Sequence, residues 1–360
     1  MLNITSRAGA WAEQVIRPAC LLVLVLMSSW AVAEPIPIKV VVVSMFEHGE
    51  VEGDRPGEFQ FWVERLPLDR SLPFPAGNWA LRFNKDGVLG MCTGGGIPNA
   101  TASVMALGMD DRFDLSRAYW LVAGIAGGDP ADLSLGSAAW AKYVIDGDLL
   151  FEIDAREIPA DWPYGIIPLG GHKPARTEAD LSTGWSVDTV RYELDAGLVD
   201  WAYRTTRNVD ITVGEETAKF RQLFSDHENA MRPPFVTIGD TLASSTYWHG
   251  HKLNEWANDW VRLYSKQKGN FMTTNMEDSG TLTALHRLDR IGRVDVSRVL
   301  VLRTASNYSV PPPGEPATWS ATADYPEHGR PALEAAYRVG SVVVKELVKG
   351  WDHYAKELPR

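Results

Sequence analysis

The chain has 360 residues, of which 45% are hydrophobic and 22% are charged. This size and composition suit one large α/β domain or two smaller ones, and they exclude fibrous and disordered classes. The formal net charge of −11 argues against binding to nucleic acid, whose phosphates would be repelled, and it offers no basic patch to an anionic membrane.

The N-terminal segment has the pattern of a secretory signal peptide. Arg7 and Arg17 precede the apolar run ACLLVLVLM, and SSWAVA then ends in small residues before Glu34. We therefore expect cleavage after Ala33 and an exported protein, in the periplasm or outside the cell. An uncleaved anchor is the alternative, although the apolar run is short for a bilayer. Cys20 precedes this run instead of following it, which argues against a lipid-anchor cysteine.

After cleavage, Cys92 would be the single remaining cysteine, so no internal disulfide could form. No later segment reaches about 18 consecutive apolar residues. We therefore expect the mature chain to be soluble, without stable insertion in a membrane.

Beyond the signal, predicted strands alternate with predicted helices. Apolar runs rich in β-branched and aromatic residues predict strands at 38–46, 79–83, 87–93, 117–129, 235–242 and 298–310. Helices are predicted at 53–66, 94–109, 251–267 and 331–358. This alternation predicts an α/β fold with a largely parallel sheet. We interpret residues 34–360 as one domain, with the Trp-rich section 143–203 as an inserted lobe.

Glycines and polar residues collect where predicted strands end. The glycines after YWLVA, the pair Gly239–Asp240, the triplet Met276–Asp278 and Asn307 all lie at such positions. Ligands of open α/β sheets bind at the carboxyl ends of strands, so we expect these residues to form one composite site.

Five segments in this order resemble the nucleoside phosphorylase and nucleosidase superfamily. They are IKVVVVSMFEHGE, VAGIAGGD, IGDTL, TTNMEDSG and VLRTASNY, and GDRPGEFQFW makes the resemblance closest to the purine nucleoside permease family. The resemblance implies a phosphorylase-like three-layer fold with a mostly parallel, twisted central sheet flanked by helices. It also implies a purine nucleoside as the ligand.

The resemblance assigns the ribose to the Met-Glu segment. Glu277 would accept hydrogen bonds from the ribose hydroxyls, and Met276 would lie beneath the sugar. Asp278 has no family role and is interpreted as an N-cap-like acid at a helix start, which is also the alternative for Glu277. The loop TGGGIPN (93–99) is interpreted as close backbone packing near the sugar.

The resemblance assigns the departing base to Asn307, where family members often carry Asp. Asp can protonate a purine at N7, whereas Asn only hydrogen-bonds it, so this catalytic position favours 6-oxopurine nucleosides, inosine or guanosine. The base would also lie near Ala126, Gly127, Tyr247 and Trp248. For the two aromatic residues, a role in the core is equally open.

Two apolar residues stand where phosphorylases bind phosphate. Val122 takes the place of an Arg-like position and Ile125 that of a Ser-like one, so backbone N–H groups at Gly127 and Gly128 are all that remain for an anion. Hydrolysis is therefore favoured over phosphorolysis.

Hydrolysis needs a base for water, and FEHGE offers Glu47 and Glu50, between which the sequence does not choose. Either is alternatively a solvated loop charge. His249 and His251 have no third ligand nearby in the sequence, so no metal and no cofactor is expected.

The expected function is that of an exported purine nucleoside-binding protein that hydrolyses the N-glycosidic bond. The alternative is a soluble component of nucleoside uptake that binds without turnover. A third interpretation is an interaction module on a degenerate fold. A homo-oligomer is compatible with each of them.

Overall fold

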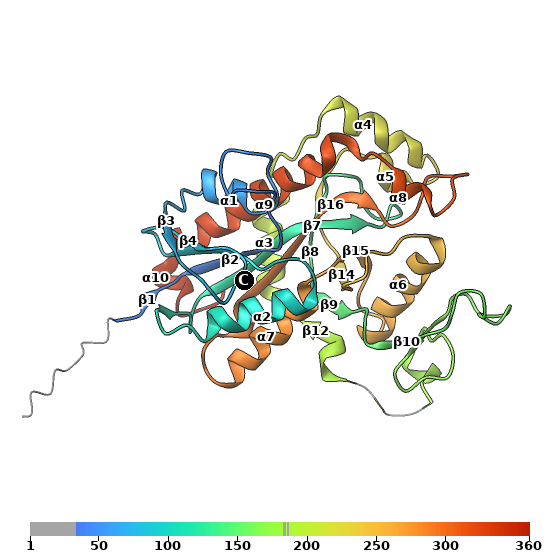
Figure 1. Ribbon diagram of the computed structural model, residues 1–360, viewed down its shortest axis with the longest axis horizontal. Helices are drawn as coiled ribbons and strands as arrows, with labels where there is room; N and C mark the ends of the chain where they lie inside the picture. Colours follow the sequence, from blue (N-terminus) through green and yellow to red (C-terminus); the bar gives the residue numbers. More distant parts are fainter. Residues whose placement is uncertain (1–33, 183–184, 186) are drawn as a thin grey trace, which may run out of the picture. The chain divides into compact units, whose positions relative to one another are not determined.

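The computed structural model describes residues 34–182, 185 and 187–360, and Figure 1 shows their path. The predicted signal peptide and Cys20 lie outside the described residues. Within 35–360, one 12-stranded sheet dominates the fold. Its strands are β2 (Val40–Ser44), β3 (Arg70–Leu72), β4 (Leu81–Phe83), β5 (Val88–Cys92), β7 (Tyr119–Gly128), β8 (Ala138–Trp140), β9 (Tyr143–Asp146), β12 (Arg191–Glu193), β13 (Val236–Ile238), β14 (Asp240–Ala243), β15 (Phe271–Asn275) and β16 (Val299–Tyr308).

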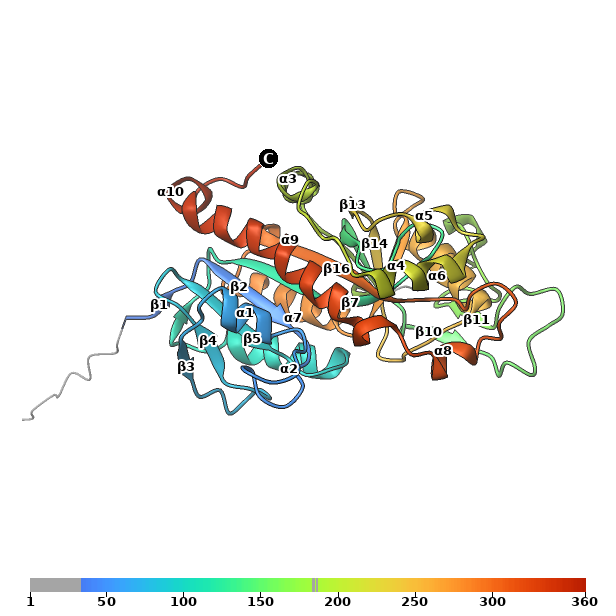
Figure 2. The same ribbon diagram turned by 90° about the horizontal axis from the view of Figure 1, so that it is seen from above.

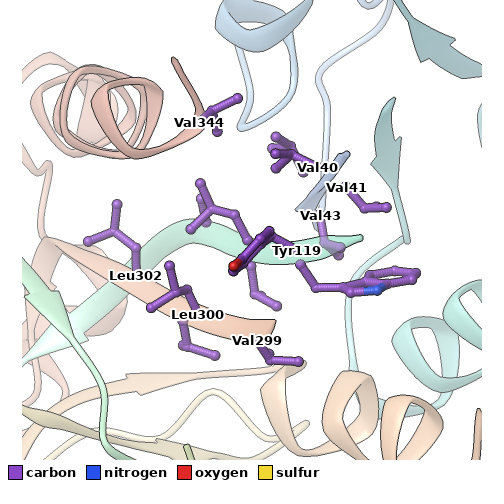
Figure 3. Packing of buried hydrophobic residues seen from close by; sticks show 14 of the residues in the cluster. Val40, Val41, Val43, Tyr119, Val299, Leu300, Leu302 and Val344 are labelled. Atoms are coloured by element: carbon purple, nitrogen blue, oxygen red, sulfur yellow. The ribbon is translucent and has the colours of Figure 1, made fainter. Parts of the chain in front are cut away.

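The centre of the sheet is a group of parallel strands. β2 pairs with β5 and β7, and β7 pairs with β16. Every residue of β2 is buried, as are most residues of β7 and β16. A strand that is covered on both faces needs apolar side chains in both directions, which explains the unbroken run VVVV. Figure 3 shows Val40 and Val43 of β2 among Tyr119, Leu300 and Val344.

A second group of parallel strands consists of β9, β14 and β15. Where it meets the first group, the strands run antiparallel. β14 is parallel to both β9 and β15, whereas β15 runs antiparallel to β7. Antiparallel strands β12, β4 and β3 extend the sheet toward its two edges. The predicted α/β fold is confirmed, and its sheet is mixed, with parallel ladders concentrated in these two groups.

Gly239–Asp240 directly follows the end of β13, but the Asp240 carboxylate is engaged by backbone groups at the starts of other strands. Asp240 is the first residue of β14, and its carboxylate accepts hydrogen bonds from the backbone N–H groups of Lys142 (3.0 Å), Tyr143 (2.7 Å) and Asn270 (2.8 Å). These groups lie at the starts of β9 and β15. Asp240 therefore ties together the amino ends of three parallel strands.

Helices cover both faces of the sheet, as expected for three layers. α9 (Arg330–Lys349) packs on β7 and β16, with α1 (Gln60–Arg65) and α3 (Ala196–Thr206) against it. α2 (Ile97–Gly108) and α7 (Asp278–Arg290) lie side by side on the other face, as Figures 1 and 2 show. The remaining helices are α4 (Glu215–Arg221), α5 (Glu228–Met231), α6 (His251–Tyr264), α8 (Trp319–Thr322) and α10 (Trp351–Tyr354).

Two of the predicted helices, at 251–267 and 331–358, correspond to α6 and to α9 with α10. In α6, Trp256, Trp260 and Leu263 are buried. The predicted final helix is interrupted, since α9 ends at Lys349 and α10 begins after Gly350.

Part of the section 143–203 belongs to the large sheet. β9 and β12 pair with each other in that sheet, and α3 packs on α9. Between β9 and β12, β10 (Leu150–Glu152) and β11 (Ile166–Pro168) form a separate antiparallel pair. A further small pair joins β1 (Ile36–Pro37) to β6 (Phe113–Asp114). In the described part of the chain, no helix has both the length and the apolar character that crossing a membrane requires.

Candidate functional site

A small cavity lies where β7, β15 and β16 end. Its volume is about 30 Å³, and many of the residues predicted to touch a nucleoside line it. The complete lining is Gly127, Thr246, Tyr247, Trp248, Thr274, Asn275, Met276, Asn307 and Ser309. The structure thus brings together residues that are separated by up to 182 positions in the chain, from Gly127 to Ser309.

Asn307 is held in a defined orientation at this cavity. The Ser306 hydroxyl donates to Asn307 Oδ1 at 3.0 Å, so the amide nitrogen is the atom left to act as a donor elsewhere. Asn307 Nδ2 donates to Tyr247 Oη at 3.0 Å. A Cβ atom on Gly127 would lie 3.3 Å from Asn307 Nδ2 and 3.0 Å from Thr274 Cγ2, so glycine allows this close approach.

Asn275 connects the cavity to the start of α7. Its Oδ1 accepts hydrogen bonds from the backbone N–H groups of Glu277 (3.0 Å) and Asp278 (2.9 Å), and so caps the helix. Its Nδ2 donates to Thr241 Oγ1 at 2.8 Å, which fixes the amide. Asn275 therefore performs the capping role that the sequence suggested for Asp278.

Asp278 is instead one half of a buried ion pair. Its carboxylate accepts two hydrogen bonds from Arg303, from Nε at 3.0 Å and from Nη2, and both side chains are almost wholly buried. Burial lowers the pKa of Arg303, but the attraction of Asp278 and its acidic neighbours outweighs burial and leaves that pKa above its usual range. Arg303 Nη1 also donates to the carbonyl oxygen of Ile125 at 3.0 Å, which ties β16 to β7.

Glu277 is buried beside this pair, at the N-cap position of α7. Its Oε1 accepts from the N–H of Gly96 at 3.2 Å, and its Oε2 lies 3.5 Å from Arg303 Nη2. Burial raises the pKa of Glu277, while Arg303 opposes that rise. The contact with Gly96 joins the glycine-rich loop 93–99 to the predicted ribose group. Glu277 does not line the cavity, which stops at Met276 and Asn275.

Glu58 is an acidic residue of this cluster that the sequence reasoning missed. It is buried, and it accepts hydrogen bonds from the N–H groups of Met45 (2.8 Å) and Ile125 (2.7 Å). Burial raises the pKa of Glu58 to about 8, with Arg303 lowering it and Glu277 raising it further. A Cβ atom on Gly124 would collide with the Glu58 carboxylate and lie 2.8 Å from Arg303 Nη1, so this glycine makes room for the cluster.

Glu47 and Glu50, which were predicted to act as a base for water, lie in different environments. Glu47 is buried, and its carboxylate accepts from the N–H groups of Phe59 (3.0 Å), Gln60 (2.6 Å) and Gly57, so it anchors the loop that leads into α1. Glu50 is exposed, and its own N–H donates to Asp54. Neither carboxylate lines the cavity.

The glycine-rich turn offers no side chain to an anion. Val122 is fully buried in the core, and Ile125 contributes only its backbone to Glu58 and Arg303. Ala126 is buried, and its carbonyl oxygen accepts from the Ser306 hydroxyl at 3.2 Å.

The two histidines of YWHGH have different surroundings. His249 Nε2 is hydrogen-bonded to the Ser320 hydroxyl, and His251 opens α6 as an exposed residue. Within the described ranges, no group of three His, Cys, Asp or Glu side chains could hold a metal ion.

The fold has a counterpart among solved structures. It is similar to that of a putative 5'-methylthioadenosine/S-adenosylhomocysteine nucleosidase from Francisella philomiragia, with a TM-score of 0.50 and 15% identity over 86% of this chain and 98% of that one. The predicted nucleoside phosphorylase-like fold is thereby confirmed.

The chain belongs to the purine nucleoside permease (NUP) family, whose model matches residues 37–359. It is 29% identical to a probable purine nucleoside permease of Schizosaccharomyces pombe over 269 residues, covering 73% of this chain and 76% of that protein. It is 32% identical to a purine nucleoside permease of Candida albicans, and here the match covers 73% of this chain and 64% of the longer relative. The resemblance seen in the sequence is confirmed.

The raised pKa of Glu58 predicts how stability depends on pH. Between the ordinary glutamate pKa of 4.5 and about 8, the folded chain binds more protons at this residue than the unfolded chain does. The free energy of unfolding should therefore fall as pH rises through this range, by up to about 1.4 kcal/mol per pH unit from this group. Glu58→Gln should flatten the dependence, as measured by urea unfolding at a series of pH values.

The exposed Glu357 provides the matched control for that experiment. Glu357→Gln should leave the pH dependence of unfolding as it is in the unaltered chain. Equal slopes for the unaltered chain and Glu58→Gln would show that Glu58 ionises in the folded protein as an ordinary glutamate does.

Proposed function

We propose that this protein binds purine nucleosides, inosine or guanosine first, and hydrolyses their N-glycosidic bond. The observation that carries the proposal is the convergence of Asn307 and Met276 on one cavity at the ends of β15 and β16, with Glu277 directly after Met276. The family and the names of the relatives support a purine nucleoside as the ligand.

Each part of the nucleoside would meet a group of suitable chemistry. Asn307 Nδ2 would donate to an acceptor of the purine, and Tyr247 and Trp248 would offer aromatic surface to the base. Met276 would lie under the ribose, and Glu277 would accept hydrogen bonds from its hydroxyls.

Hydrolysis would use a water molecule that attacks the anomeric carbon as the bond to the base breaks. Glu58 would act as the base in place of Glu47 and Glu50. Like them it does not line the cavity, but it lies in the Arg303 cluster with Glu277, and burial raises its pKa to about 8. Glu58 would take the proton of the attacking water, and the departing purine would be stabilised by the hydrogen bond from Asn307. Asn307 has no proton to give, so the purine anion would take its proton from solvent.

The second candidate function is nucleoside uptake, in which the protein binds and delivers the nucleoside without turnover. The names of the relatives favour it, because each of them is described as a permease. Export through the predicted signal peptide is part of both proposals, and mass measurement on secreted protein would test it by showing whether the chain begins near Glu34.

Incubation with inosine separates hydrolysis from binding alone. We expect free hypoxanthine, measured by chromatography, at a rate that rises with pH toward about 8 as Glu58 loses its proton. Added phosphate should not increase this rate, because Val122 and Ile125 cannot bind it. Tight binding without release of hypoxanthine would favour uptake, and a rate that rises and saturates with phosphate would show phosphorolysis.

Substitution at Glu277 tests the ribose assignment. Glu277→Gln keeps the shape but removes the charge, so affinity for inosine should fall about ten- to a hundredfold. Affinity for hypoxanthine, which has no ribose, should barely change. Calorimetric titration with both ligands measures this, with Glu357→Gln as the control. Inosine affinity equal to that of the unaltered protein would refute the assignment.

A further inference from the structure

The cavity at Asn307 is too small for the ligand proposed above. Its volume is about 30 Å³, whereas sites for ligands of this size enclose roughly 300–1,000 Å³. Some of its lining must therefore move before a nucleoside can enter. Gly127, Thr274, Asn275 and Asn307 belong to central strands, and Met276 and Ser309 directly follow two of them. The other lining residues, 246–248, lie in the loop after β14.

In that loop, Tyr247 is placed to move without its neighbours. Its side chain is 60% exposed, and the hydrogen bond to Asn307 is its single hydrogen bond within the described residues. The next residue, Trp248, is 8% exposed and packs against Trp256 and Phe271, with ring centroids 5.7 and 6.2 Å apart. His249 is held by Ser320. Tyr247 can therefore rotate without disturbing the packing of Trp248, and exposed side chains rotate in picoseconds to nanoseconds.

The Tyr247 hydroxyl accepts a hydrogen bond from Asn307 Nδ2, the donor that a purine would need. Asn307 Oδ1 faces the Ser306 hydroxyl, and Nδ2 is the amide atom that faces Tyr247. Tyr247 Oη accepts from Nδ2, which is what an oxygen or ring nitrogen of a purine would do. The hydroxyl and the base therefore compete for the same N–H group.

We propose that Tyr247 is a gate that keeps the empty site shut by occupying the Asn307 donor with its hydroxyl. A purine opens the gate by offering its own acceptor to Asn307, which compensates for the hydrogen bond that Tyr247 gives up. A ligand without such an acceptor leaves Asn307 Nδ2 without its partner, so the gate also selects among ligands. This inference rests on the proposed binding of nucleosides, but not on their hydrolysis.

Tyr247→Phe tests the gate, because it keeps the ring and removes the competing hydroxyl. If a closed state reduces the apparent affinity by the fraction of protein that is open, the variant should bind inosine about two- to tenfold more tightly. The gain should be in the association rate, measured by stopped-flow fluorescence, with the dissociation rate nearly unchanged. Tyr203→Phe, on α3, is the matched control and should bind as the unaltered protein does.

The outcomes separate the gate from the proposed function. Weaker or equal binding by Tyr247→Phe, beside clear binding by the unaltered protein, would overturn the gate and leave nucleoside binding intact. A gain that comes from slower dissociation would also overturn it, because the substitution would then act on the bound state. Absence of inosine and guanosine binding by both proteins would overturn the proposed function and the gate with it.

Discussion

The buried ion pair between Arg303 and Asp278 is the contact on which the rest of the site depends. Arg303 lies on the central strand β16, and Asp278 is the first residue of α7, so the pair fixes the start of that helix against the sheet. Removing one partner of such a pair costs about 3–5 kcal/mol, because a charge is left buried without compensation. Met276 and Glu277 directly precede Asp278, and their positions therefore follow from this one pairing.

The cluster around Arg303 contains more acidic than basic side chains, and burial raises the pKa values of Glu58 and Glu277. Three carboxyl groups, those of Glu58, Glu277 and Asp278, lie close to the single guanidinium of Arg303. Asp278 has the best contacts with Arg303, so the cost of burial falls on the other two, and the pKa of Glu58 rises to about 8.

The sequence predicted well those features that depend on short-range pattern. The unbroken apolar run of β2 and the amphipathic face of α6 each correspond to the observed element, because burial on one or both faces sets the period of apolar residues. Gly127, Met276 and Asn307 were expected together because they lie near strand ends, and the structure places them around one cavity.

The failures concern contacts made over long distances in the chain. Glu58 lies in a loop before a short helix, and its neighbour Arg303 is in another part of the sequence, so no local pattern marked it as functional. Asp240 was expected with the other strand-end residues, but the predicted strand 235–242 is divided into β13 and β14, so Asp240 begins β14. The sequence shows that Glu47 is acidic. It does not show the backbone N–H groups from which the Glu47 carboxylate accepts hydrogen bonds.

A crystal structure of the protein with inosine tests the central claim most directly. We expect the purine within hydrogen-bonding distance of Asn307 Nδ2, the ribose hydroxyls at Glu277, and the Tyr247 side chain rotated away from Asn307. A larger cavity of about 590 Å³ exists elsewhere, lined in part by Tyr192, Tyr264 and His286. Inosine bound in that cavity, with Asn307 still hydrogen-bonded to Tyr247, would contradict the assignment of the site.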